Sequence, residues 1–178
     1  NVPIVVEAQR WSSSKPVVSI PTNMTVGQTY SATVTVRNTG NLPWTNAQRF
    51  RIGTQNPQDT TIWGGALSSP WEVFSGASNR LFLPLDPMSP GGPDATLTFP
   101  VKAPSTPGVY NFQLQVMRDL QAPGWFGTPS DNITITVSAI NTAPTVTITA
   151  PQNGAILAAP ATINLRATAS DPDGGDSI

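Results

Sequence analysis

Apolar and polar residues alternate in short runs along most of the chain, and turn residues separate the runs. In residues 29–37, Tyr30, Ala32, Val34 and Val36 alternate with threonine, serine and arginine. A period of two places the apolar side chains on one face of a pleated strand. The same pattern predicts further strands over 2–8, 17–20, 50–52, 97–101, 110–116, 133–137, 145–150 and 163–167.

The pattern of a long helix is missing, because no stretch of about eleven residues carries apolar positions at i, i+3, i+4 and i+7 without Pro or Gly. Strands with one apolar and one polar face, separated by turns, are typical of a two-sheet sandwich. The predicted fold is therefore an all-β, immunoglobulin-like sandwich. Pro100 cannot donate to a strand ladder, so it fits only an edge strand or a strand end. Tyr110 follows the turn Pro107-Gly108 and is either a tyrosine corner, whose hydroxyl caps a nearby backbone group, or an ordinary core residue.

The spacing of strands and turns predicts four segments. Residues 1–12 carry a strand that either ends a preceding domain or completes the open edge of a neighbour. Residues 13–138 form the sandwich, and residues 139–144 form a polar linker that ends in Pro144. Residues 145–178 contain about two strands, whereas an immunoglobulin-like sandwich needs about seven, so we expect a partial second domain.

Charge and composition narrow the classes of partner and chemistry. Nine basic and ten acidic residues give a net charge of −1, so we expect neither nucleic acid nor an anionic membrane surface as a partner. The chain has no Cys and no His, which excludes disulfides, thiolate chemistry and a histidine proton relay. No apolar run approaches the roughly 20 residues that span a bilayer, so we expect no membrane insertion.

Catalysis has little support in the sequence. A serine nucleophile needs a base, and without His only Lys15, Lys102 or a carboxylate could serve. The carboxylates lie mostly in predicted turns, with no motif around them. We therefore expect that the protein is not an enzyme.

The five tryptophans are candidates for ligand or partner contacts. Aromatic rings stack on sugars or anchor interfaces, and the candidate contact residues are Trp11, Trp63, Trp71 and Trp125. Trp11 and Trp71 are the better candidates for exposed contacts. In the alternative interpretation, which we favour, Trp44, Trp63 and Trp125 plug the ends of a small sandwich and hold its loops.

Three carboxylates near the C-terminus form a candidate calcium site. Asp171, Asp173 and Asp176 could supply the hard oxygen ligands that calcium prefers. The alternative, which we favour, is an Asp-Pro-Asp-Gly turn in which the Asp side chains bond to local backbone. No other cofactor is expected.

Several ordered blocks between Met24 and Val137 carry a resemblance to a known family. These blocks are Val26–Tyr30, Val36–Gly40 with Trp44, Arg51–Asp59 with Trp63-Gly64, Ala103-Pro104 with Pro107–Tyr110, and Trp125–Gly127. They resemble the bacterial version of the four-tryptophan (FW) immunoglobulin-like domain, which also occurs in autophagy receptors. The chain departs from the family at Val34, where a Trp is frequent.

The C-terminal blocks Pro144–Pro151, Asn153-Gly154 and Ala167–Gly174 resemble the opening of a bacterial immunoglobulin-like repeat. Such repeats lie between domains in secreted glycosidases and adhesins. Pairs of these modules occur in large bacterial surface proteins, including those with rearrangement-hotspot (RHS) repeats.

The resemblance and the composition together lead to three functional hypotheses. The first is a non-catalytic, extracellular or cell-surface bacterial module with a structural and adhesive role, whose partners are adjacent immunoglobulin-like domains. The second is a carbohydrate-binding module that recognises polysaccharide through exposed indoles, beside calcium if calcium binds. The third is an assembly subunit in which strand complementation links neighbouring subunits into a filament.

Overall fold

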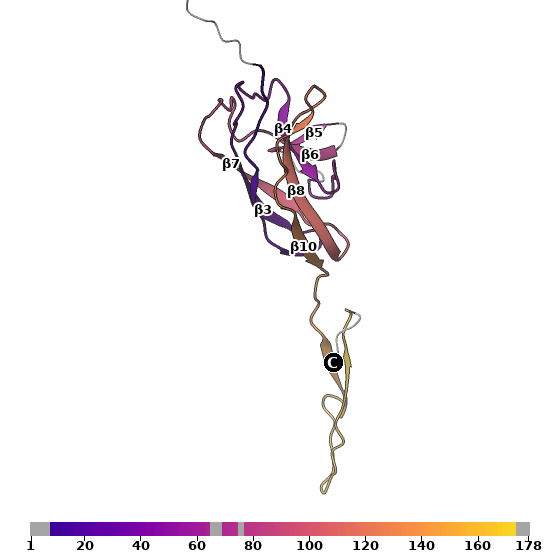
Figure 1. The fold of residues 1–178 in the computed structure, drawn as a ribbon. Helices are drawn as coiled ribbons and strands as arrows, with labels where there is room; N and C mark the ends of the chain where they lie inside the picture. The colour runs from indigo at the N-terminus through magenta and orange to yellow at the C-terminus, as the bar shows by residue number, and fades with distance from the viewer. Residues whose placement is uncertain (1–7, 65–68, 75–76, 174–178) are drawn as a thin grey trace, which may run out of the picture. The chain divides into compact units, whose positions relative to one another are not determined.

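A computed structural model of the chain describes residues 8–64, 69–74 and 77–173. The chain divides into two compact units, Asn1–Ala139 and Ile140–Ile178. In the described ranges every regular element is a β-strand and none is a helix (Figure 1). The prediction of an all-β fold is therefore confirmed.

The first unit is an immunoglobulin-like sandwich of two sheets. Its strands are β1 Val17–Ser19, β2 Asn23–Thr25, β3 Thr29–Val36, β4 Phe50–Gln55, β5 Trp71–Phe74, β6 Ala77–Leu81, β7 Ala95–Lys102, β8 Gly108–Arg118, β9 Trp125–Phe126 and β10 Ile133–Ser138. One sheet has the order β1-β3-β7, and the other has the order β2-β10-β8-β4-β6-β5, with β9 added alongside β8. The consecutive strands β1 and β2 thus belong to different sheets, so the chain between Ser19 and Asn23 links the two sheets.

Strand pairing is antiparallel except between β2 and β10, which run parallel with Met24 opposite Val137. The long pair β3–β7 runs from Thr29 opposite Lys102 to Val36 opposite Ala95. Because β7 is an edge strand of its sheet, Pro100 lies at an edge, as its missing N–H requires.

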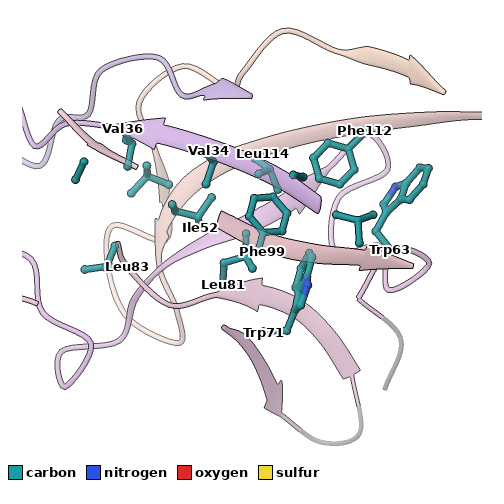
Figure 2. Packing of buried hydrophobic residues seen from close by; sticks show 14 of the residues in the cluster. Val34, Val36, Ile52, Trp63, Trp71, Leu81, Leu83, Phe99, Phe112 and Leu114 are labelled. Atoms are coloured by element: carbon teal, nitrogen blue, oxygen red, sulfur yellow. The ribbon is translucent and has the colours of Figure 1, made fainter. Parts of the chain in front are cut away.

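The core lies between the two sheets and is filled from alternate positions of each strand (Figure 2). In β3, Ala32, Val34 and Val36 are buried, and the intervening threonines are partly exposed. This is the alternation that predicts the strand from its sequence. Val34, where the FW family often has Trp, is completely buried in the core cluster (Figure 2).

The predicted strands over 29–37, 50–52, 97–101, 110–116 and 133–137 are all found, as β3, β4, β7, β8 and β10. Of the two alternatives for Tyr110, the structure shows the tyrosine corner, because Tyr110 Oη donates to the Thr106 carbonyl at 2.8 Å. The period-two alternation does not predict four short strands, namely β2, β5, β6 and β9.

Residues 8–12 belong to the sandwich. Ser12 and Arg10 accept backbone hydrogen bonds from Thr39 and Asn41, at 2.9 and 3.2 Å, and Trp11 packs on the core. The described part of the predicted N-terminal segment, residues 8–12, is thus held along the 38–41 loop. The predicted strand over 2–8 lies outside the described residues except for Ala8.

The second unit contains the antiparallel pair of β11, Thr145–Ala150, and β12, Arg166–Ser170. The predicted strand over 163–167 thus begins three residues later. Val146 and Ile148, the apolar positions whose alternation predicts the strand over 145–150, are 67% and 69% exposed. A two-stranded sheet offers no second layer to cover a face, which explains why alternation within the described unit does not produce burial.

Candidate functional site

Two of the predicted contact residues are internal. Trp63 is fully buried and Trp71 is 2% exposed. Neither indole can therefore make the surface contact for which it was a candidate. Trp71 Nε1 donates to the Pro100 carbonyl at 2.6 Å, and its ring meets Phe99 edge-on. Since β5 and β7 are edge strands of different sheets, Trp71 closes one side of the sandwich.

Trp63 and Trp44 also anchor loops, Trp63 through its indole and its backbone and Trp44 through its backbone alone. Trp63 Nε1 donates to the Asn111 carbonyl at 3.0 Å, and its own carbonyl accepts from the Lys102 backbone at 3.1 Å. Trp44 exchanges two backbone hydrogen bonds with Met88. The favoured interpretation of these two tryptophans as internal plugs is confirmed by their complete burial.

Trp125 lies on the outer face of the larger sheet and is half-buried. The Arg80 guanidinium lies 4.9 Å from its ring centroid, a cation–π distance. Its ring also covers Gly53, where a Cβ atom would come within 2.5 Å of Trp125 Cη2. Only glycine at position 53 leaves room for this ring, so the Trp125 side chain packs directly on the backbone of β4 at Gly53.

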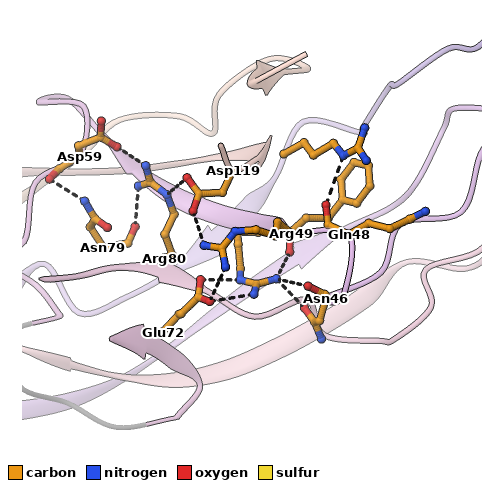
Figure 3. A network of polar contacts seen from close by, with 11 residues as sticks. Asn46, Gln48, Arg49, Asp59, Glu72, Asn79, Arg80 and Asp119 are labelled. Atoms are coloured by element: carbon orange, nitrogen blue, oxygen red, sulfur yellow. Dashed lines mark hydrogen bonds and ion pairs between the residues drawn. The ribbon is translucent and has the colours of Figure 1, made fainter. Parts of the chain in front are cut away.

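A network of ion pairs extends across the same outer face (Figure 3). Arg51 binds Glu72 with two hydrogen bonds, from Nε at 2.7 Å and from Nη2 at 2.9 Å. Arg49 Nη2 contacts Asp119 at 2.7 Å, and Arg49 Nη1 lies 3.5 Å from Glu72. The network therefore joins β4 to the β5–β6 hairpin and to the end of β8.

A second arm of the network starts at Arg80 on β6. Its Nη2 donates to Asp59 at 2.5 Å, and its Nε lies 3.7 Å from Asp119. Asp119 is thus flanked by two guanidinium groups, and both Arg80 and Asp119 are only 8% exposed. Burial of this kind requires paired charges, because an isolated ion loses its hydration without compensation.

The electrostatic effect of the network is clearest at Glu72. The hydrogen bonds from Arg51, reinforced by the charges of Arg51 and Arg49, hold the pKa of Glu72 below its ordinary value. The hydrogen bond to Asp119 raises the pKa of Arg49. The Glu72 carboxylate is thereby kept ionised and paired, which suits attachment of the hairpin and opposes proton transfer.

Trp11 lies beside a small surface pocket of about 240 Å³. The pocket is lined by Gln9, Trp11, Leu42, Pro43, Gln48 and Arg118. The Trp11 ring rests on Phe50 at 5.0 Å between centroids, and the Arg118 guanidinium lies 5.6 Å from the Trp11 ring. Among the predicted contact residues in the described chain, Trp11 alone lines this partly exposed pocket.

The described part of the candidate calcium site is an internal turn. Asp171 Oδ1 accepts from the Asp173 backbone N–H at 2.8 Å, and Asp173 Oδ2 accepts from the Thr142 N–H. This is the arrangement expected of the alternative Asp turn. Asp176 lies outside the described residues, and within them no three metal-ligating side chains gather into a group that could hold an ion.

The ion network is not apparent from the sequence. In the sequence, Arg49 and Arg51 are only polar positions that alternate with Phe50 and Ile52, although two arginines on one strand face are a signal of acidic partners. Asp119 is 70 positions from Arg49, so no local pattern joins them.

Within the described ranges, no helix has the length and apolar character to cross a membrane.

The fold and this site define an immunoglobulin-like β-sandwich module. Residues 144–177 match the family model described as a bacterial Ig domain, so the C-terminal unit is similar to that family. No curated protein matches the chain.

Several solved structures resemble the chain at low identity. The CARDB domain of a Pyrococcus furiosus protein, solved in complex with di-metal ions, is 12% identical, with 77% of this chain and 99% of that chain covered and a TM-score of 0.42. The PKD domain of an M14-like peptidase from a Thermoplasmatales archaeon is 16% identical, with 73% and 98% covered and a TM-score of 0.37. Escherichia coli alpha-2-macroglobulin is 20% identical, with 75% and 7% covered and a TM-score of 0.36. None of these similarities bears on the function of this chain.

Proposed function

We propose that this chain is a non-catalytic, extracellular immunoglobulin-like module that acts as a spacer and contact surface in a larger bacterial surface or secreted protein. The observation that carries the proposal is the parallel pairing of β2 with β10. The second unit begins at Ile140, immediately after β10 ends at Ser138. Tension from that unit therefore enters the sandwich at the C-terminal end of β10.

The parallel geometry makes this junction resistant to pulling. Tension from the N-terminal side first loads residues 10–14 and β1, which pair with residues 37–41 and β3, and it reaches the start of β2 once these contacts yield. Tension from the second unit reaches the end of β10. Because the strands run in the same direction, the two forces slide them past one another and load their hydrogen bonds together. These bonds include Thr136 N–H to the Thr22 carbonyl at 2.8 Å and Val26 N–H to the Ser138 carbonyl at 3.0 Å.

The side-chain chemistry of the sandwich also supports a structural role. The carboxylates of Glu72 and Asp119 are paired with arginines, so they are unsuited to general acid or base work. The outer face of β3 and β7 presents hydroxyl groups, with Thr35 Oγ1 and Thr96 Oγ1 2.7 Å apart. A hydroxyl-bearing face on which β3 and β7 place only one charged residue, Lys102, suits contacts with neighbouring modules. The FW and RHS relationships are part of this proposal and rest on the motif blocks alone.

Single-molecule force spectroscopy tests the proposal on the full chain placed between two marker domains. We expect one main unfolding event that releases roughly 400 Å, since about 116 residues from β2 to β10 extend at about 3.3–3.6 Å each. Val26→Pro removes the Val26 N–H donor and should lower the unfolding force. Leu81→Ala is the control, because it creates a core cavity away from β2 and β10 and should lower the free energy of unfolding with little change in force. Extension of the wild-type chain without a resolved force peak would contradict the spacer role.

A further inference from the structure

The pocket beside Trp11 has the chemistry of a ligand site and has no part in the spacer role. Its only charged lining residue is Arg118, and its other polar lining residues are Gln9 and Gln48. Within the described residues, neither glutamine side-chain amide forms a hydrogen bond, and both residues are exposed. The pocket therefore offers one cation, two amides and one half-buried indole to a ligand.

Arg118 is held in place before any ligand arrives. Its Nε donates to the Gln48 carbonyl and its Nη1 donates to the Ala122 carbonyl, both at 3.2 Å. The guanidinium also lies 5.6 Å from the Trp11 ring and 5.5 Å from the Phe50 ring. Its Nη2 has no partner among the described residues. A fixed guanidinium whose Nη2 keeps both N–H donors unused is preorganised for an anion, because little freedom remains to be lost on binding.

We propose that this pocket binds an acidic saccharide, in which Arg118 pairs with a uronate carboxylate and the Trp11 ring packs against the sugar. Indoles present a rigid apolar face with a polar edge, which suits a pyranose ring. The amides of Gln9 and Gln48 each carry donors and an acceptor, as neighbouring sugar hydroxyls require. The pocket volume of about 240 Å³ is below the roughly 300–1,000 Å³ of sites for drug-sized ligands, so it fits one sugar unit of a longer polymer.

The surroundings favour a saccharide over an acidic peptide. Bound peptides often extend a sheet by pairing with an open strand edge. The pocket is lined mainly by loop residues from 9–11 and 42–48, and Arg118 is the last residue of β8. In this part of the described chain the backbone of residues 10–12 is already paired with that of residues 39–41, so an extended peptide would find few unpaired backbone groups.

Calorimetric titration of the full chain tests the proposal, with trigalacturonate as the acidic probe, galactotriose as the neutral probe and an acetylated Asp-Gly-Asp peptide as the competing class. We expect saturable binding of trigalacturonate that weakens with added salt, and affinity for galactotriose lower by about tenfold or more. Arg118→Gln should lower the affinity for trigalacturonate about tenfold, and Gln48→Ala should lower it severalfold.

Matched controls separate the site from general charge and stability effects. Arg37→Gln removes an exposed positive charge directly after β3, and Gln121→Ala removes an exposed glutamine outside the pocket lining. Both controls should bind trigalacturonate like the wild type. The proposal is overturned if trigalacturonate does not bind, if Arg118→Gln binds it unchanged, if both saccharides bind equally, or if the peptide binds more tightly. None of these results would alter the force peak expected of the spacer.

Discussion

Replacement of Trp71 distinguishes an internal anchor from a surface contact. The indole is 2% exposed, meets Phe99 edge-on at 5.6 Å and donates to the Pro100 carbonyl at 2.6 Å. It joins the edge strands of both sheets, so its loss affects the closure of the sandwich. We expect Trp71→Ala and Trp71→Phe to destabilise the first unit by clearly different amounts.

The magnitudes follow from the two kinds of interaction at Trp71. Truncation of a buried Trp to Ala costs about 3–5 kcal/mol, because the cavity relaxes only partly. Trp71→Phe keeps an aromatic ring against Phe99 and loses the N–H donor to the carbonyl of half-buried Pro100, at a cost of about 1 kcal/mol. A domain of ordinary stability has about 5–15 kcal/mol in total, so Trp71→Ala removes a large share of it.

Urea unfolding followed by far-ultraviolet circular dichroism measures these costs without relying on tryptophan emission. Thermal midpoints should fall by roughly 2–4 °C for each kcal/mol. Trp125→Phe serves as the control, because Trp125 is half-buried on the outer face and contributes a cation–π contact of about 0.5–1 kcal/mol with Arg80. A Trp71→Ala protein within about 0.5 kcal/mol of the wild type, the usual range for surface substitutions, would refute the assignment of Trp71 as an anchor.

Three further predictions concern the polar contacts. Glu72→Gln should cost about 3 kcal/mol at neutral pH, because it leaves buried Arg51 without its anionic partner; urea unfolding measures the loss. Since the ion pair lowers the pKa of Glu72, its stabilisation is complete above the ordinary glutamate pKa and is lost as the pH falls through the folded-state pKa, so the two proteins should converge in stability in acid. Tyr110→Phe should cost about 1 kcal/mol in the same assay, the net value of one hydrogen bond. Calcium should leave the thermal midpoint unchanged, because Asp171 and Asp173 bond to backbone N–H groups, and a rise that saturates with calcium would contradict this assignment.

The long strands could be predicted because each buries one face. β3, β7, β8 and β10 carry the period-two pattern over at least six residues, so their alternation is visible without knowledge of their partners. The missed strands have two to five residues each. In β5, Trp71 and Glu72 are both directed into interactions, one inward and one toward the arginines, so polarity does not separate the two faces.

The fate of the tryptophans could not be deduced from local sequence. A Trp in a loop rich in Gly and Pro has the same local context whether its ring points inward or outward. The acceptors that bury Trp63 and Trp71 are the carbonyls of Asn111 and Pro100, 48 and 29 positions away. Burial was therefore decided by the folding of the two sheets, which only the tertiary structure reveals.

The ion network explains how a chain with few charges holds an edge hairpin in place. Three of its nine basic residues, Arg49, Arg51 and Arg80, converge on the outer face of the larger sheet. The β5–β6 hairpin is then fixed from both faces, by Trp71 toward the smaller sheet and by Glu72 toward the arginines. Since an edge hairpin held on one face alone could detach and expose its unpaired backbone groups, the double attachment protects the edge against pairing with other chains. For the spacer proposed above, which would stand in a row of similar domains, this protection matters because neighbouring sandwiches with open edges would otherwise pair with one another.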